Sequence, residues 1–138
     1  MNTITLEQAQ KGVTAAMAAA KKIKAKMNIA IVDAGAHLLA FARMDGAWIG
    51  SADISIRKAR TARLFDMNSG AIGKLSQPGK ELFNIEHSNY GLITFPGGVP
   101  VRNAKGVVIG AVGVSGSSVK NDHLVAEAGQ AAIEKAGR

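Results

Sequence analysis

Hydrophobic positions at the start of the chain recur at the spacing of a helix. Thr5 and Gln8 stand at the separation of a capping box, which places the start of this helix at Thr5. Several lysines follow the last apolar positions, where positive charge stabilises the carboxyl end of a helix dipole. The pattern therefore predicts an amphipathic first helix with an apolar face made of Leu6, Ala9, Val13, Ala16, Met17, Ala20 and Ile23.

Two strand-like segments follow this helix. Residues 28–32 form a short apolar run, and residues 37–44 have mixed, alternating polarity. Asp33-Ala34-Gly35-Ala36 lies between them and has the composition of a tight turn, in which glycine is the residue suited to a positive φ. We therefore expect a β-hairpin.

The middle of the chain changes from helical to irregular. Residues 51–65 contain neither glycine nor proline and are expected to form a second helix. Gly70, Gly73, Pro78 and Gly79 then divide the chain into turns. We expect one short helix reaching to Ile85 and a strand over residues 92–94.

The last third of the chain predicts a second hairpin and a final helix. Residues 99–102 are a short strand, residues 103–106 a hairpin loop, and residues 107–114 an apolar run typical of a strand covered on both faces. Gly110 and Gly113 within this run indicate close approach of another backbone or of a ligand. With a last helix over residues 119–136, the order of elements predicts an α+β fold, an antiparallel sheet with flanking helices.

Composition limits the classes of protein that the chain can belong to. Its 138 residues suit a single domain, 1–138, and 24 alanines and 16 glycines make small side chains dominant. The absence of cysteine excludes disulfides, thiolate metal sites and thiol nucleophiles. We expect no membrane span, because no apolar stretch is long enough. The first residues lack the basic start and apolar run of a secretory signal, so we expect a cytoplasmic protein.

The charge does not by itself predict a nucleic-acid partner. Seventeen lysines and arginines against ten acidic residues give a net charge of +7. Only six residues are aromatic, too few for a stacking surface, and no RNA- or DNA-binding motif is present. We therefore expect no nucleic acid as partner.

Three histidines are candidates for chemistry. None has the spacing of a metal pair on a helix, so no metal site is expected. His87 lies in an irregular segment beside Glu86 and close to Tyr90, and loops often carry function. The alternative is an ordinary surface histidine, which is also the simpler interpretation of His37 and His123.

Other candidates are charged residues and flexible turns. Arg43 and Asp45 end the second expected strand and suit a polar ligand, or else a salt bridge and a turn. Lys58 is offset by about 100° from Arg57 around the helix, so it can point toward the sheet while the arginines face solvent. Gly97 and Gly98 can expose backbone amides to an anion, or else form a plain turn. The Ser115 hydroxyl can bind an anion, or else the segment that it begins caps the last helix.

The chain contains four stretches with a recognisable pattern, at residues 29–35, 41–47, 58–62 and 97–100 leading to 109–116, and Asp122 and Ala126 fit the same pattern. Together they resemble the GlcG/HbpS family, also called the DUF336 domain, and the C-terminal domain of PduO-type proteins. Ala36 departs from the family, which commonly has a second glycine there. The resemblance implies a profilin-like α+β sandwich and a homo-oligomer. Some members of this family bind haem, and others are encoded beside enzymes of glycolate, propanediol or glycerol breakdown, so the resemblance implies a role of one of these kinds.

Two functional hypotheses follow. The first is a small-molecule-binding protein for haem or a related tetrapyrrole, accessory to a small-molecule catabolic pathway of the glycolate, diol or glycerol type. Its candidate axial ligands are His87 or Tyr90, with His37 as a third, since iron in haem accepts histidine or tyrosine. The second is an enzyme acting on a small carboxylate or hydroxy compound, with Asp45 and Lys58 as its charged groups. A scaffolding role comes third. The high content of alanine and glycine also favours a homo-oligomer, in which small-residue faces pair.

Overall fold

Helix α1 (Leu6–Lys22) begins where the capping box predicts. In the computed structural model, which describes residues 2–137, the hydroxyl of Thr5 accepts a hydrogen bond from Gln8 N, and Thr5 N donates to the Gln8 side chain. These two bonds satisfy backbone donors that the first turn of a helix leaves unpaired. The expected start of the helix is thereby confirmed.

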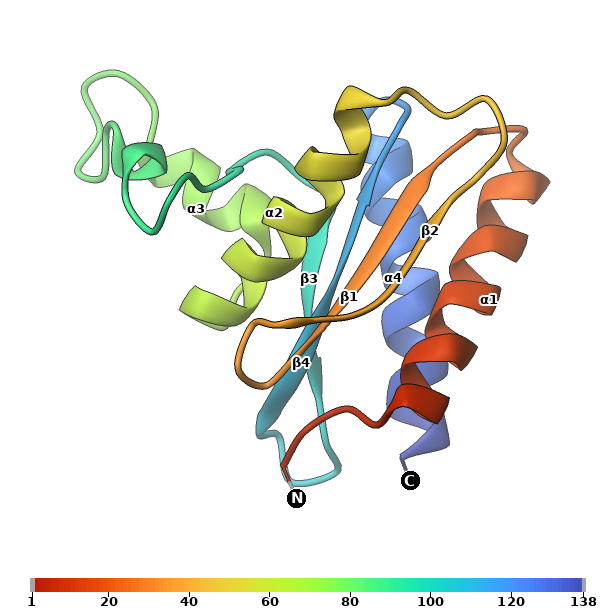
Figure 1. Cartoon of the computed structure of the whole chain (residues 1–138). Helices are drawn as coiled ribbons and strands as arrows, with labels where there is room; N and C mark the ends of the chain where they lie inside the picture. The colour runs from red at the N-terminus through yellow and green to blue at the C-terminus, as the bar shows by residue number, and fades with distance from the viewer. Residues whose placement is uncertain (1, 138) are drawn as a thin grey trace.

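Four antiparallel strands form the sheet in the order β2-β1-β4-β3. Each expected hairpin is present, and β1 pairs with β4 as well as with β2, which joins the two hairpins into one sheet (Figure 1). The expected α+β class is confirmed. The strands are β1 (Asn28–Asp33), β2 (Leu38–Arg43), β3 (Gly98–Arg102) and β4 (Val108–Ser115).

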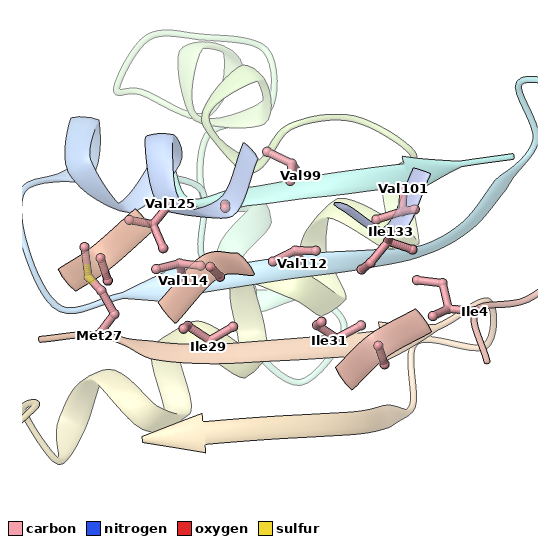
Figure 2. Packing of buried hydrophobic residues seen from close by; sticks show 14 of the residues in the cluster. Ile4, Met27, Ile29, Ile31, Val99, Val101, Val112, Val114, Val125 and Ile133 are labelled. Carbon is pink, nitrogen blue, oxygen red and sulfur yellow. The ribbon is translucent and has the colours of Figure 1, made fainter. Parts of the chain in front are cut away.

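Helices cover both faces of this sheet. Figure 1 shows α1 and α4 (Val119–Ala136) on one face and α2 (Gly50–Phe65) on the other. The main core lies under α1 and α4, where isoleucines and valines of the strands meet Val125 and Ile133 of α4 (Figure 2). A smaller core under α2 is made mostly of alanines. Its buried members are Ala30, Val32, Ala59, Ala62 and Ala111.

A glycine in β4 lets α2 approach the sheet closely. A Cβ atom placed on Gly113 would lie 2.0 Å from the carbonyl oxygen of Ser55 and 2.5 Å from Ala59 N. No side chain fits there, so the two backbones are in contact. The expectation of a close backbone approach at Gly113 is confirmed, and β4 is covered on both faces as its apolar run predicts.

The irregular segment differs from the expectation in two ways. Its helix α3 (Ser69–Leu75) ends well before Ile85, and residues 85–87 form only a single 3-10 turn. Residues 92–94 do not form a strand. Ile93 N instead donates to the Thr61 hydroxyl of α2, at 3.2 Å, which holds this segment against a helix and away from the sheet.

The turn between β1 and β2 places its strained residue one position later than expected. Ala36, not Gly35, has a positive φ, of 63°. The Asp33 carboxylate organises the turn by accepting hydrogen bonds from Gly35 N and His37 N. The side chain of Asp33 therefore compensates for an alanine in a conformation that favours glycine.

No helix in the described part of the chain is long and apolar enough to span a bilayer.

Candidate functional site

Lys58 lies at the centre of a buried polar cluster between α2, β4 and α4. Its side chain has no exposed surface, and its ammonium donates to the carbonyl of Val114 and to Asp122 Oδ2, both at 2.9 Å. The ammonium also lies 4.8 Å from the centre of the Phe95 ring, within range of a cation–π interaction. The inward direction predicted from its helical offset is confirmed.

Asp122 is the carboxylate that neutralises Lys58. It is 2% exposed, stands in the first turn of α4, and accepts a hydrogen bond from Ser117 N through Oδ1 at 2.9 Å. Burial lowers the pKa of Lys58 below its ordinary value, and the charge of Asp122 opposes this effect. Sequence reasoning did not single out this pair, because the two residues stand 64 positions apart.

Gly97 and Gly98 belong to the packing of the same cluster. A Cβ atom on Gly97 would lie 2.6 Å from the Lys58 ammonium, and one on Gly98 would lie 2.3 Å from the Lys58 carbonyl oxygen. Both glycines are buried, and Gly98 N donates to the Ser69 hydroxyl at 2.9 Å. Their backbone amides are therefore not open to solvent, and neither is Ser115, which is 5% exposed.

Asp45 does not belong to this cluster. It is exposed in the connection from β2 to α2, and the ion-pair partner of Lys58 is Asp122. Arg43 is also exposed, at the end of β2, where its neighbour across the sheet is Asn28. On its other side Asn28 faces Ser115, so the ends of three neighbouring strands meet here.

His87 and Tyr90 lie together on an exposed arm, which we define as residues 76–91 (Figure 1, upper left). Tyr90 is 95% exposed, and His87 is also exposed. The arm is fastened to α2, because the Arg57 guanidinium donates to the carbonyls of Tyr90 and Gly91 and Arg60 donates to Asn89 O.

Glu86 ties the middle of the arm to the chain that follows it. Its carboxylate accepts a hydrogen bond from the Thr94 hydroxyl. Partial burial raises the pKa of Glu86, but the hydroxyls of Thr94 and Ser76 outweigh this effect, so its pKa is lower than usual. The arm is thus held at Glu86 and at residues 89–91.

His37 directly follows the β1–β2 turn. Figure 1 shows this turn apart from the arm. Arg63 of α2 donates to Ala34 O at 2.6 Å and so fixes this turn. The arginines expected to face solvent therefore hold two separate loops through backbone carbonyls. Of the three candidate haem ligands, His87 and Tyr90 belong to the exposed arm and His37 does not.

His123 stands near the start of α4, outside the arm, as the interpretation of an ordinary helix residue expects. It lines a surface hollow of about 220 Å³ between α3 and α4, together with Lys74 and Pro96. Its Nε2 lies 3.3 Å from Glu127 Oε1. The sequence carries no signal for this hollow, because α3 and α4 meet only in the folded chain. Within residues 2–137, no group of three or more histidine, cysteine or acidic side chains is placed to hold a metal ion.

Comparison with known proteins gives consistent results for sequence and structure. The family model described as "Haem degrading protein HbpS-like" matches residues 4–131. An uncharacterized 15.0 kDa protein of Citrobacter freundii, encoded in the dhaT-dhaS intergenic region, is 41% identical over 126 residues, which are 91% of this chain and 88% of the relative.

Two solved structures share the whole architecture. The Klebsiella pneumoniae protein ORFY, a DUF336 protein, superposes with a TM-score of 0.92 at 37% identity, covering 95% of this chain and 90% of that one. The structure of PduOC in complex with haem superposes with a TM-score of 0.88 at 28% identity, covering 94% of both chains.

Proposed function

Because the chain belongs to the HbpS-like family, we propose that it binds haem or a related tetrapyrrole. The haem complex of PduOC, which has the same fold, supports this proposal. The observation that carries it for this chain is the pair of exposed ligand side chains on the arm, the His87 imidazole and the Tyr90 phenol.

The chemistry of the arm fits the group. Imidazole and phenolate are both established axial ligands of haem iron. Apolar surface for the porphyrin ring is present nearby, since Phe83 is 53% exposed and Leu75 is 44% exposed. Lys74 and Lys80 are exposed and suit the propionates. Bound haem would supply redox or oxygen chemistry, and His87 or Tyr90 would hold its iron.

The enzyme hypothesis built on Asp45 and Lys58 gains no comparable support. Lys58 is fully buried and already bonded to Asp122 and Val114 O, so its ammonium reaches no substrate in this conformation. We retain the proposal of an accessory role in a small-molecule catabolic pathway. It rests on the family resemblance of the sequence.

Titration with hemin tests the proposal. We expect a saturable Soret shift with one haem per chain, and its loss or displacement in His87→Ala or Tyr90→Phe. His37→Ala examines the third candidate, and His123→Ala is the matched control, a histidine of α4 outside the arm. A wild-type chain that leaves the hemin spectrum unchanged would contradict haem binding. Equal shifts in wild type and in the His87 and Tyr90 variants would contradict the arm as the site.

A further inference from the structure

A groove of about 340 Å³ opens where the connection from α1 to β1, the loop after β2 and the loop after β4 come together. It lies at the end of the sheet where α1 finishes and β1 begins, and the arm does not contribute to it. None of the candidate haem ligands lines it. The lining residues are Lys24, Ala25, Lys26, Gly46, Trp48, Gly116 and Ser117.

The walls of the groove are held by backbone contacts. The buried Asn28 side chain donates to Trp48 O at 3.0 Å, which ties the loop after β2 to the first residue of β1. A Cβ atom on Gly116 would lie 2.4 Å from Lys26 O, so the loop after β4 lies directly against the segment before β1. These contacts fix the spacing of the lining residues in the absence of any ligand.

The groove is positively charged and lacks a compensating acid. Among residues 2–137, no carboxylate lies within 4.0 Å of the ammonium of Lys24 or Lys26. The Lys26 side chain lies across Gly46, where an added Cβ would be 3.1 Å from its Nζ. The φ of Gly46, +80°, also disfavours any other residue. The Lys26 side chain thus packs directly against Gly46, and a residue with a Cβ there would push it slightly aside.

Trp48 supplies a flat surface beside these charges. It is 68% exposed, an unusual state for the largest aromatic side chain. Ser117 adds a hydroxyl, which accepts a hydrogen bond from Asn121 Nδ2 at 3.1 Å and keeps its own proton for donation. An indole face, two ammonium groups and a hydroxyl form a complementary set for a planar anion.

We propose that this groove binds a small organic anion, with its carboxylate or phosphate between Lys24 and Lys26 and its planar portion on Trp48. The volume is that of a pocket for a small ligand. The net charge of +7 also favours the approach of anions to the lysine-rich end of α1. This site is separate from the arm and does not depend on haem binding.

The fluorescence of Trp48 provides a direct test, because it is the only tryptophan of the chain. The probes are phenyl phosphate and benzoate, which combine a ring with an anion. Inorganic phosphate lacks the ring, and benzyl alcohol lacks the charge. Measurements are made at constant ionic strength set with potassium chloride. We expect saturable quenching by one or both ring-bearing anions, and the stronger of the two identifies the preferred anionic group.

Substitution of the lysines distinguishes a site from general charge effects. Lys24→Gln and Lys26→Gln are each expected to lower the affinity for the tighter-binding probe by about fivefold or more, because each removes a charge-assisted contact. Lys22→Gln, at the end of α1 but outside the groove, is the matched control and should retain the affinity. His87→Ala should retain it as well, which separates this result from the outcome of the hemin titration.

Three outcomes would overturn the whole proposal, and a fourth would overturn the stacking on Trp48. The first is the absence of saturable quenching by both ring-bearing anions. The second is an equal response to benzyl alcohol, which would show that the charge is not recognised. The third is equal affinity in the Lys22, Lys24 and Lys26 variants. If inorganic phosphate binds as tightly as phenyl phosphate, stacking on Trp48 is excluded. Circular dichroism of each variant verifies that the fold is intact.

Discussion

At the scale of single residues, the buried contact between Lys58 and Asp122 stands out. Removing two charges from water is costly, and their attraction offsets that cost only when the geometry is good and the remaining polar atoms are bonded. Here the ammonium has a second acceptor in Val114 O, and the carboxylate has a donor in Ser117 N. Loss of one partner therefore leaves a buried charge that nothing compensates.

A double-mutant cycle tests this contact. We expect Lys58→Met and Asp122→Asn each to lower the free energy of unfolding by about 3–5 kcal/mol at neutral pH. The double variant should lose much less free energy of unfolding than the sum of the two single losses, because it leaves neither charge behind. Asparagine keeps an acceptor for Ser117 N, so the cycle isolates the charge. Urea denaturation gives the values, and strictly additive losses would contradict the coupling.

The same variants report the lowered pKa of Lys58. Because this pKa lies below its ordinary value of 10.5 in the folded chain, the unfolded chain binds more protons between the two values. Wild-type stability, measured relative to Lys58→Met, should therefore rise as the pH is raised through that window toward 10.5. A relative stability that falls over the same interval would show that the pKa is raised instead.

The sequence accounts for part of this cluster. The inward direction of Lys58 follows from its position on a helix whose neighbouring face is marked by Ala59 and Ala62. Its partner does not follow, because local spacing carries no information about a residue on another helix. The same limit applies to Gly97 and Gly98, whose role as space for Lys58 is visible only in the folded chain.

At the scale of elements, helices and hairpins were predictable because each carries its own local signals. The capping residues of α1 and α4 and the apolar run of β4 are examples. Residues 92–94 have strand-like composition, but Ile93 N donates its hydrogen bond to the Thr61 hydroxyl and not to a neighbouring strand. The hydrogen-bond partner of a short segment depends on tertiary structure, so composition alone wrongly predicted a strand at residues 92–94.

The β1–β2 hairpin carries a strained alanine that a substitution can relieve. Ala36→Gly should raise the free energy of unfolding by about 0.5–1 kcal/mol, because glycine adopts a positive φ without steric cost, although it also gains freedom in the unfolded chain. Ala34→Gly in the same turn is the control, since Ala34 does not have a positive φ. Thermal or urea denaturation decides, and equal effects of the two variants would contradict the prediction.

At the scale of the whole molecule, one side keeps apolar surface uncovered. Strand β2 is an edge of the sheet, and Leu38 on it is 50% exposed. Beside it Leu6 of α1 and Phe41 line a hollow of about 370 Å³. Exposed apolar side chains gathered next to an unpaired strand edge are typical of an association surface.

We expect the chain to form a homo-oligomer, at least a dimer, through this side. Light scattering or sedimentation at micromolar concentration should give a mass above the 14.3 kDa of one chain. Phe41→Glu should lower that mass toward one chain, because it places a charge in the apolar hollow. Ala104→Glu, at an exposed position of the β3–β4 loop, adds the same charge and is the control. A single-chain mass that is constant on dilution would contradict the expectation.

The topology also determines when the chain can fold during its synthesis. Strand β1 is synthesised well before β4, yet β4 is one of its two neighbours in the sheet. Lys58 likewise cannot form its ion pair before Asp122 is synthesised, and the main core is incomplete without Val125 and Ile133 of α4. A nascent chain that lacks α4 therefore exposes an apolar sheet face and an unpaired lysine, which makes it a substrate for chaperones until α4 has been synthesised.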